Sequence, residues 1–339
     1  MDALIFLCIA LFGAIVPTVF YVYLVYWLDR YEREPVWLLA LAYLWGAIPA
    51  ILLALVPEVI FDKLVSDLLG KNDLANALSY GVSPPLFEES GKGVFLIGLL
   101  LVFWQHFDDP VDGIVYGSMV GFGFAMTENL FYFLGAFEQG GLGGGLVNIF
   151  MRNVIFGLNH AFFTSWVGLA LGWARTHHGL FHRVIVPVLG WMAAMFFHSV
   201  HNLGATFAEA TLCFSFLIAF FSDWGGILLM TVLAFWFIGH ERRWLTSELE
   251  PEVASGLITP QELQVITSST QRAYTRLSAL LSKGWGAYRR LGQFFAAATD
   301  LAFTKHQLHM FGEERGNSAE IARLRERLLA LRTASGASS

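Results

Sequence analysis

Charge is scarce in this sequence. Only 14% of its 339 residues are Asp, Glu, Lys or Arg, whereas an ordinary soluble domain has about a quarter. In their place 56% of the residues are hydrophobic, and the mean hydropathy is +0.57. This balance excludes an ordinary soluble domain and predicts an integral membrane protein. The net charge of −6, without any dense basic run, gives no indication of nucleic-acid binding.

Cysteine is scarce too. Cys8 and Cys213 both lie in apolar runs, and they form neither a CxxC pair nor a metal-type spacing. We expect both to be buried as small apolar residues. A basic leader is also missing at the N-terminus, where an apolar run begins at Ala3 and continues to about Leu28. We interpret this run as a full membrane span rather than as a cleaved signal peptide.

Long apolar runs dominate what the chain does contain. Seven of them can bridge a hydrocarbon core of about 30 Å at about 1.5 Å per residue. They lie near residues 3–28, 36–56, 85–105, 113–134, 153–174, 184–204 and 211–239. Most connections are short, with longer ones at 57–84 and in the glycine-rich stretch 135–148, which favours antiparallel neighbours. We predict an all-α polytopic membrane protein built as a bundle of about seven transmembrane helices.

Two features inside these runs concern packing. Gly117 and Gly121 stand four residues apart in the fourth run, a spacing of small residues that lets two helices approach closely. We interpret this pair as a packing surface rather than as a nucleotide loop. The polar stretch 222–226 interrupts the seventh run, which fits either one tilted span or a half-helix followed by a span.

The charges divide the chain into two parts. Of the 21 Lys and Arg residues, 8 precede residue 240 and 13 follow Gly239, while the acidic residues divide 17 and 10. The first part therefore has a net charge of 8 − 17 = −9 and the second 13 − 10 = +3. We predict a transmembrane core at 1–240 and a small, helical, cytosolic region at 241–339.

The cytosolic region has two helix signals. Thr259 is a predicted N-cap, followed by Pro260 at the first helical position. Residues 318–332 predict an amphipathic helix. Its apolar face consists of Ile321, Leu324, Leu328 and Leu331. We expect a helical appendage here, with a regulatory or membrane-surface docking module as the alternative.

Basic residues in the short loops predict the orientation of the bundle, because such residues gather on the cytoplasmic side. Arg30 and Arg33 lie in one loop, Arg175 and Arg183 in another, and further arginines follow the last span. With seven spans these three loops share one side. We therefore expect the N-terminus outside and the C-terminus in the cytoplasm.

Ionisable residues inside the apolar runs are few. Burying such residues in a membrane is costly, so they usually face the bundle interior or water and mark a functional site. The runs contain Glu88, Glu89, Lys92, Glu128, His160, His198, His201 and Asp223, and Asn159 and Asn202 stand beside the histidines.

Four of these residues are predicted to lie at one depth. Glu88 follows the start of the third run by about three residues, and Glu128 precedes the end of the fourth by about six. His160 and His198 occupy matching positions in the fifth and sixth runs. Because consecutive spans run in opposite directions, all four fall roughly 5–11 Å below the same membrane face. The predicted orientation makes this the outer face.

This combination of side chains suits amide hydrolysis. A carboxylate held away from water beside a like charge is a stronger base and can take a proton from water. A second acid or an imidazole can protonate the leaving amine, and histidine and asparagine can stabilise the oxyanion. Lys92 shares a helix face with Glu88, as Asn202 does with His198. No serine or cysteine has an evident base beside it, so we expect water as the nucleophile.

Several short motifs stand in these runs in a fixed order. They are FEESGK at 87–92, FAMTEN at 124–129, the intramembrane His160, and HSVHN at 198–202. Together they resemble the motifs of PrsW-family intramembrane proteases, which are distant relatives of the CAAX-prenyl and bacteriocin-processing proteases. DRYEREP after the first run and EVASGLITPQEL after the last also resemble that family. The resemblance covers about residues 1–265.

The resemblance implies a glutamate-dependent endopeptidase in a bacterial plasma membrane. Its substrate would be a single-pass membrane protein or peptide, cleaved on the extracytoplasmic side as in the first cleavage of an anti-sigma factor. Carried over to this sequence, Glu88 or Glu89 would activate the water, and we favour Glu88 with Glu89 tuning it. Glu128 would share water binding or proton transfer, and Lys92 would hold the second carboxylate.

The remaining roles fall to the later spans. By the same resemblance, His198 and Asn202 would form the oxyanion side, and His160 would bind water or complete the site. These side chains also suit a metal, since carboxylate and imidazole are ordinary ligands of zinc and other divalent ions. The ligands would be Glu88, Glu128, His160 and His198. We favour a metal-free site, because the sequence has no HExxH motif, and we keep a metal-dependent protease as an alternative.

Two non-proteolytic alternatives remain. A proton-coupled transporter or channel would spread its polar groups through the depth of the membrane, whereas here they are predicted to share one layer. A buried polar network that only fixes helix packing would not need paired carboxylates.

Overall fold

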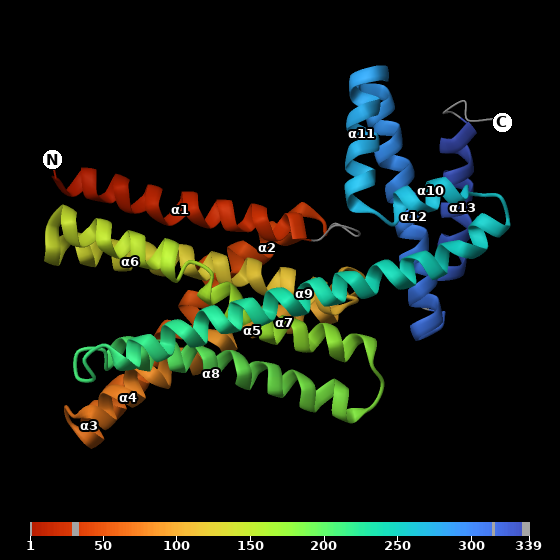
Figure 1. Ribbon diagram of the computed structural model, residues 1–339. Coiled ribbons are helices and arrows are strands. Elements are labelled where there is room, and N and C mark those ends of the chain that lie inside the picture. Colours follow the sequence, from red (N-terminus) through yellow and green to blue (C-terminus); the bar gives the residue numbers. More distant parts are fainter. Residues whose placement is uncertain (1, 29–33, 314–315, 334–339) are drawn as a thin grey trace. The chain divides into compact units, whose positions relative to one another are not determined.

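The structure, a computed structural model, describes residues 2–28, 34–313 and 316–333. In these ranges the chain forms helices and no strands (Figure 1). The helices are α1 (Asp2–Leu28), α2 (Val36–Trp45), η1 (Gly46–Ala50), α3 (Ile51–Leu69), α4 (Asp73–Gly81), α5 (Ser83–Val102), η2 (Trp104–His106), α6 (Pro110–Phe150), η3 (Met151–Ile155), α7 (Asn159–Thr176), η4 (Phe181–Ile185), α8 (Val186–Thr206), α9 (Phe214–Ala254), α10 (Pro260–Ile266), α11 (Ser269–Lys283), α12 (Trp285–Phe311) and α13 (Asn317–Thr333). The predicted all-α class is confirmed.

Several helical stretches are long and apolar enough to cross a membrane. Five are found among the described residues, namely Ala3–Trp27, Val36–Leu69, Pro110–Thr176, Phe181–Thr206 and Phe214–Ala254. Helix α5, with 20 residues, is long enough as well but carries three charged residues in its first half. A polytopic membrane protein is therefore confirmed, while the number of seven spans stays a prediction.

The two longer connections predicted at 57–84 and 135–148 are mostly helical. Helix α3 continues to Leu69 and is followed by α4, and α6 continues to Phe150. A helix pairs the backbone N–H and C=O groups of a segment within that segment, and the Asn72 side chain caps the start of α4 by accepting from the Ala75 backbone N–H.

Gly141 turns α6 back on itself. Its φ is 57° and its ψ −153°, a conformation that glycine adopts without steric cost. The two limbs of α6, residues 110–140 and 142–150, meet where Gly145 approaches the ring of Phe137. A Cβ atom on Gly145 would lie 2.1 Å from that ring.

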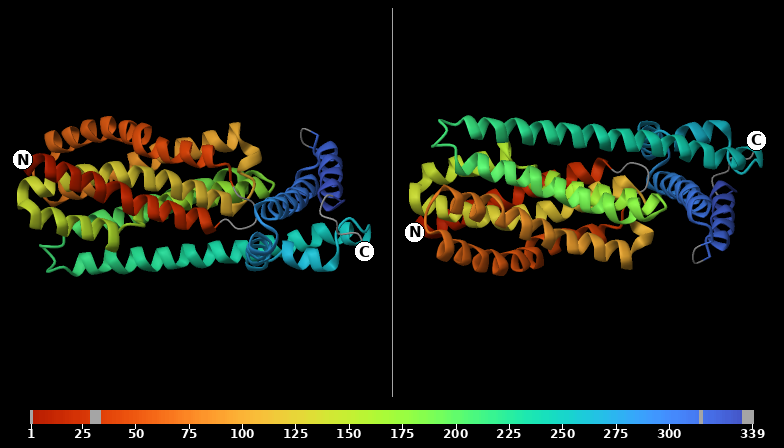
Figure 2. Two further views of the ribbon diagram at one scale, coloured as in Figure 1. Left: turned by 90° about the horizontal axis from the view of Figure 1, so that it is seen from above. Right: turned by 90° about the horizontal axis from the view of Figure 1, so that it is seen from below.

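Helix α1 packs along α6. The rings of Phe6 and Phe137 stack with centroids 4.8 Å apart, and Ala10 and Ala14 are fully buried in the same cluster. Figure 2 shows the N-terminal end of α1 beside the turn that joins the two limbs of α6. Aromatic stacking and small residues thus hold this pair of helices together.

Glycines bring α6 and α7 into backbone contact. A Cβ atom on Gly117 would lie 2.8 Å from the carbonyl oxygen of Thr164, and one on Gly121 would lie 2.3 Å from that of His160. The row continues one turn earlier with Gly113. The predicted packing role of Gly117 and Gly121 is confirmed, and it fixes His160 close to the axis of α6.

Cys8 and Cys213 are both exposed, so the expectation that they are buried was wrong. Cys8 lies on α1, a candidate span. Lipid tails are as apolar as a protein core, and an apolar sequence run therefore does not separate a lipid-facing position from a buried one.

The described chain divides into two compact units. One consists of residues 2–28 and 34–234, and the other begins at Phe235. The division falls within α9, which also contains residue 240, where we predicted it. Helix α9 is continuous through the polar stretch 222–226, so the alternative of a half-helix followed by a span is wrong. Arg30 and Arg33 lie outside the described residues, and the orientation stays a prediction.

The second unit contains α10 to α13. The Thr259 side chain accepts a hydrogen bond from the backbone of Glu262, whose carboxylate reaches back to the backbone of Thr259, so the predicted helix start is confirmed. Helix α13 contains the predicted amphipathic segment. On it Ile321, Leu324 and Leu328 are buried and Leu331 is partly exposed.

Candidate active site

Polar side chains from three helices meet inside the first unit. Helix α5 supplies Glu88, Glu89 and Lys92, α7 supplies His160, and α8 supplies His198. All five are buried, and Glu89 and Lys92 have no exposed surface. The structure thus brings together residues that lie up to 110 positions apart in the chain.

The start of α5 sets the position of its three charged residues. Two prolines occupy the first helical turn, at positions where a missing N–H costs nothing. From that start, Lys92 stands four residues after Glu88 and three after Glu89, and both spacings bring the side chains onto one face. One helix therefore delivers two carboxylates and their counter-charge to the same point.

Lys92 lies at the centre of the cluster. Its Nζ is 2.7 Å from Glu89 Oε1, 3.2 Å from Glu88 Oε2 and 3.1 Å from His160 Nδ1. The ring of Phe124 lies 3.8 Å from the same atom, a cation–π contact. An ammonium group has three hydrogens and no lone pair, so it donates in all three hydrogen bonds. The Nδ1 atom of His160 therefore carries a lone pair.

The tautomer of His160 follows from this. Its ring proton sits on Nε2, which lies 2.7 Å from Glu128 Oε2. Glu128 Oε2 also accepts a hydrogen bond of 2.6 Å from Arg152 Nη2, and Arg152 Nε donates to Asn129 at 2.5 Å. Glu128 thus orients His160 and is itself neutralised by Arg152.

The Glu89 carboxylate has three hydrogen-bond partners. Its Oε1 accepts from Lys92 and lies 3.1 Å from His198 Nδ1, and its Oε2 accepts from Thr164 Oγ1 at 3.0 Å. Because an ionised carboxylate only accepts, His198 carries its proton on Nδ1. The Nε2 atom of His198 is then left with a lone pair.

Glu88 differs from its neighbour. Among the described residues, its one hydrogen bond comes from Lys92. Two imidazole nitrogens with lone pairs, His160 Nδ1 and His198 Nε2, each lie 3.9 Å from Glu88 Oε2. Glu88 therefore keeps acceptor capacity for a water molecule at the point where both histidines converge.

The donor set also fits a divalent metal. Glu88, Glu89, His160 and His198 each offer a ligand atom, and these atoms lie within 4.8 Å of one another. Glu128, which we predicted as a ligand, instead contacts the far nitrogen of His160. That is the usual place of a carboxylate that orients a ligating histidine.

Asn202, which we predicted as a site residue, and the neighbouring His201 make their hydrogen bonds outside this cluster. Asn202 is not brought into the cluster, because its side-chain amide donates to the carbonyl oxygen of Tyr80 at 3.0 Å. His201 Nδ1 lies 2.7 Å from Asp223 Oδ2, to which Asn159 also donates at 2.8 Å. These three form a second polar cluster that the prediction did not include.

Arg152 and Thr164 belong to the site but were not predicted from the sequence. Arg152 directly precedes the fifth apolar run. At that position the sequence does not distinguish it from the basic residues that commonly flank a membrane span. Thr164 stands four residues after His160, so the helical spacing was the signal that could have found it.

The helical membrane bundle and its buried carboxylate–imidazole cluster are the features expected of an intramembrane protease. A family model described as PrsW family intramembrane metalloprotease matches residues 34–237, which is more than half of the chain and includes the whole cluster. The chain therefore belongs to the PrsW family of intramembrane proteases.

Curated relatives agree with this assignment. The chain is similar to Protease PrsW of Oceanobacillus iheyensis, with 27% identity over 171 residues, covering 50% of this chain and 70% of the relative. Protease PrsW of Bacillus subtilis is 30% identical over 147 residues, or 43% and 60% of the two chains. Protease PrsW of Clostridioides difficile is 27% identical over 180 residues, or 52% and 73%. No solved structure matches this chain.

Proposed function

We propose that this chain is an intramembrane endopeptidase that cleaves a membrane-anchored protein near the outer face of a bacterial plasma membrane. Its substrate is a single-pass membrane protein or peptide, of the type that an anti-sigma factor represents. The observation that carries the proposal is the surroundings of Glu88. This buried carboxylate has one hydrogen bond among the described residues, and its Oε2 lies 3.9 Å from one ring nitrogen of each of His160 and His198.

Proton transfer follows from these surroundings. A water molecule beside Glu88 gives its proton to the carboxylate as its oxygen attacks the peptide carbonyl carbon. The proton then passes to the facing Nε2 of His198, and the resulting imidazolium donates it to the leaving amine as the C–N bond breaks. Glu89 holds the opposite nitrogen of His198 and stabilises that imidazolium.

The positively charged groups of the cluster prepare it for this chemistry. The ammonium of Lys92 offsets the charge of Glu88 and Glu89 in the ground state and lies near the developing oxyanion. Preorganised charge in a dry site is worth more than the same charge in water. Glu128 and Arg152 keep His160 in one tautomer, so its Nδ1 lone pair stays available as the acceptor for Lys92 beside Glu88.

A specific observation supports a second candidate chemistry, a metal-dependent form of the same protease. Lone pairs of Glu88, His160 and His198 converge, and Glu89 and Glu128 accept the N–H hydrogens of the two rings, as partners of ligating histidines do. These three residues would hold the ion. A divalent ion bound there would supply Lewis acidity and lower the pKa of a water ligand. Lys92 competes with such an ion for Glu88 and His160.

The function is tested with the full chain reconstituted in nanodiscs and a panel of single-pass substrates. We expect Glu88→Gln and His198→Ala each to abolish cleavage. Glu138→Gln, the same change at an exposed position of α6, is the matched control and should cleave normally. Full activity of both cluster variants would refute the protease assignment.

The cofactor is tested on the same preparation. Metal content is measured together with turnover before and after chelation and readdition of zinc. We expect turnover to survive chelation, as it should for a metal-free site. A stoichiometric divalent ion whose removal stops turnover and whose readdition restores it would establish the metal-dependent form instead.

A further inference from the structure

The second unit contains a long stretch without acidic residues. Between Glu262 and Asp300, none of the 37 residues is acidic, although 10 of the 100 residues from His240 to Ser339 are. Five basic residues lie in that stretch, namely Arg272, Arg276, Lys283, Arg289 and Arg290. It covers α11 and the first half of α12 and carries a net charge of +5.

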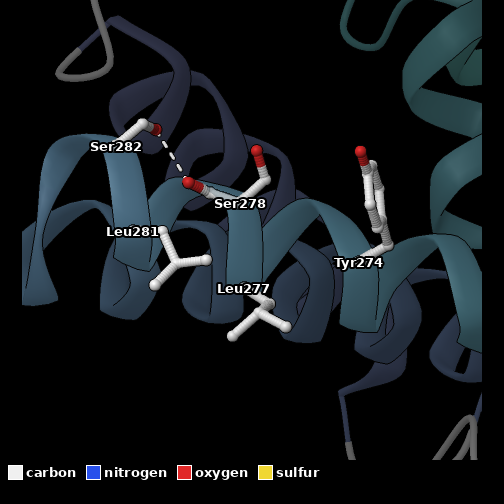
Figure 3. A pocket seen from close by; sticks show the side chains of 5 residues that line it. All are labelled: Tyr274, Leu277, Ser278, Leu281 and Ser282. Atoms are coloured by element: carbon white, nitrogen blue, oxygen red, sulfur yellow. Dashed lines mark hydrogen bonds between the residues drawn. The ribbon is translucent and has the colours of Figure 1, made fainter.

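The same stretch exposes large apolar side chains. Tyr274 is 74% exposed, Leu277 52%, Leu281 80% and Trp285 66%. Leu277 and Leu281 stand four residues apart and share one side of α11. Tyr274 lies nearly one turn earlier and leaves the helix on the side of Ser278 (Figure 3), and Trp285 begins α12 after the turn at Gly284. We call these four residues the α11 patch. Few other large apolar side chains of the second unit are exposed outside its first two residues.

Figure 3 shows how α11 presents this patch. The side chains of Leu277 and Leu281 leave one side of the helix, whereas Ser278 and Ser282 leave the other, and Ser282 donates to the carbonyl oxygen of Ser278. The opposite face of α11 packs on α12 and contains the buried Ala279. The helix therefore has a packed face and an apolar face left uncovered in this structure.

Basic and aromatic side chains gather where α11 meets α12. Lys283, Arg289 and Arg290 are exposed around the turn at Gly284. The ring of Tyr288 stacks on Trp285 with centroids 5.1 Å apart and 21° between the planes. The guanidinium of Arg276 in turn lies 4.2 Å from the Tyr288 ring centroid. We call Arg276, Lys283, Tyr288, Arg289 and Arg290 the basic tip.

We propose that the α11 patch and the basic tip dock onto the anionic surface of a lipid bilayer. Exposed leucine and tryptophan side chains with lysine and arginine beside them are the composition of protein surfaces that lie in the membrane interface. Anionic lipid headgroups complement the charge of +5. Each basic side chain near such a surface strengthens binding by roughly fivefold.

The way the unit is attached to the chain also favours a bilayer as the partner. Helix α9 begins in a candidate span and continues into this unit without a break, so a membrane surface is always within reach and docking is intramolecular. A second copy of this chain is a poorer partner, because it would bring one basic tip against another and like charges repel.

The test uses the full chain with Cys8 and Cys213 replaced by serine. A nitroxide is attached at Leu281→Cys or at the neighbouring Ser282→Cys, which is exposed on the other side of α11. The protein is reconstituted in nanodiscs of phosphatidylcholine alone or mixed equally with phosphatidylglycerol. Collisions of the nitroxide with oxygen, which enters lipid, and with a polar nickel chelate, which does not, are measured by power saturation.

We expect the label at position 281 to become oxygen-accessible and nickel-protected in the anionic discs only. The label at position 282 should be clearly more nickel-accessible in the same discs. The double variant Arg289→Gln and Arg290→Gln should lower the docked-to-free ratio by about 25-fold, at about fivefold for each charge. Its melting curve should match that of the parent protein, which separates lost docking from lost folding.

Three results would overturn the proposal. One is a nickel-accessible label at position 281 in anionic discs, and another is equal immersion in both lipid compositions. The third is dipolar coupling between position 281 labels in discs that hold two copies, which would assign the patch to a second copy of the chain. Peptidase activity is not part of the readout, so the proposal stands or falls independently of the proposed function.

Discussion

Lys92 Nζ lies 2.7 Å from Glu89 Oε1, and both side chains are completely buried. The bundle thus contains its own counter-ion, one helical turn from two carboxylates. This pairing explains how α5 tolerates three charged residues in an apolar environment, where each alone would be costly.

Removing the ammonium group should therefore cost much of the stability. Lys92→Met leaves Glu88 and Glu89 together without a cation, and breaking a buried ion pair on one side costs about 3–5 kcal/mol. Thermal unfolding in detergent, followed by tryptophan fluorescence, measures the loss. Lys63→Met is the matched control, because Lys63 is exposed on α3 and should change stability by less than about 0.5 kcal/mol. Equal melting curves for the two variants would contradict the role of Lys92.

Substitutions of the two adjacent glutamates should have different effects on cleavage and on stability. Glu88→Gln should abolish cleavage and leave stability nearly unchanged, since Glu88 makes one hydrogen bond among the described residues. Glu89→Gln should lower stability by about 1.5–3 kcal/mol, because Glu89 accepts from three charged or polar groups. Cleavage and melting are measured on both variants in parallel. The reverse assignment, with a stable and inactive Glu89→Gln, would make Glu89 the base.

A methyl group added between α6 and α7 should disturb the site from a distance. In Gly121→Ala the new Cβ would meet the carbonyl oxygen of His160 at 2.3 Å, so the helices must separate. We expect a stability loss of about 1–3 kcal/mol. Turnover should fall by about 100-fold, as expected for a displacement of about 1 Å.

The control for this variant is Gly98→Ala on α5. A Cβ there has no atom within 4 Å, and alanine favours the helix by up to about 1 kcal/mol. Substrate cleavage and melting are measured for both glycine variants. Normal turnover by Gly121→Ala would show that the backbone contact between Gly121 and His160 does not set the position of the His160 side chain in the site.

Glu128 and Arg152 should act as a coupled pair. A double-mutant cycle with Glu128→Gln and Arg152→Gln should give a coupling free energy of about 0.5–3 kcal/mol, because their 2.6 Å contact joins a carboxylate and a guanidinium. Both single variants should reduce turnover, since each disturbs the tautomer of His160. Additive effects on stability in the cycle would contradict this arrangement.

The parts of the fold and site that were predicted correctly rest on local periodicity. Apolar runs of sufficient length identify membrane helices, and spacings of three and four residues place Glu88, Glu89 and Lys92 on one face. Alternating span direction predicts that His160 and His198 come near Glu88, and the structure places a ring nitrogen of each 3.9 Å from its carboxylate. These are properties of single helices and of their order in the chain.

The parts that were missed depend on pairs of helices. Gly141 is one of several glycines in a row, and no local pattern distinguishes the one that takes a positive φ. Asn202 follows His198 by four residues, yet the rotation of α8 and the nearby carbonyl of Tyr80 draw its amide away from the cluster. The sequence likewise does not reveal that Arg152 reaches back to Glu128, since the two are adjacent only after α6 has turned.

The turn at Gly141 also has a consequence for biogenesis. Glu128 and Asn129 lie on the first limb of α6, Arg152 follows the second limb, and the three are joined by contacts of 2.5 and 2.6 Å. Either limb alone would bring an unpaired charge into hydrocarbon, at about 2.5–3.5 kcal/mol. Glycosylation mapping of nascent chains that end after residue 140 or after residue 155 should show stable insertion only for the longer chain. The unit that leaves the translocation channel is then a neutralised pair of helices rather than a single span.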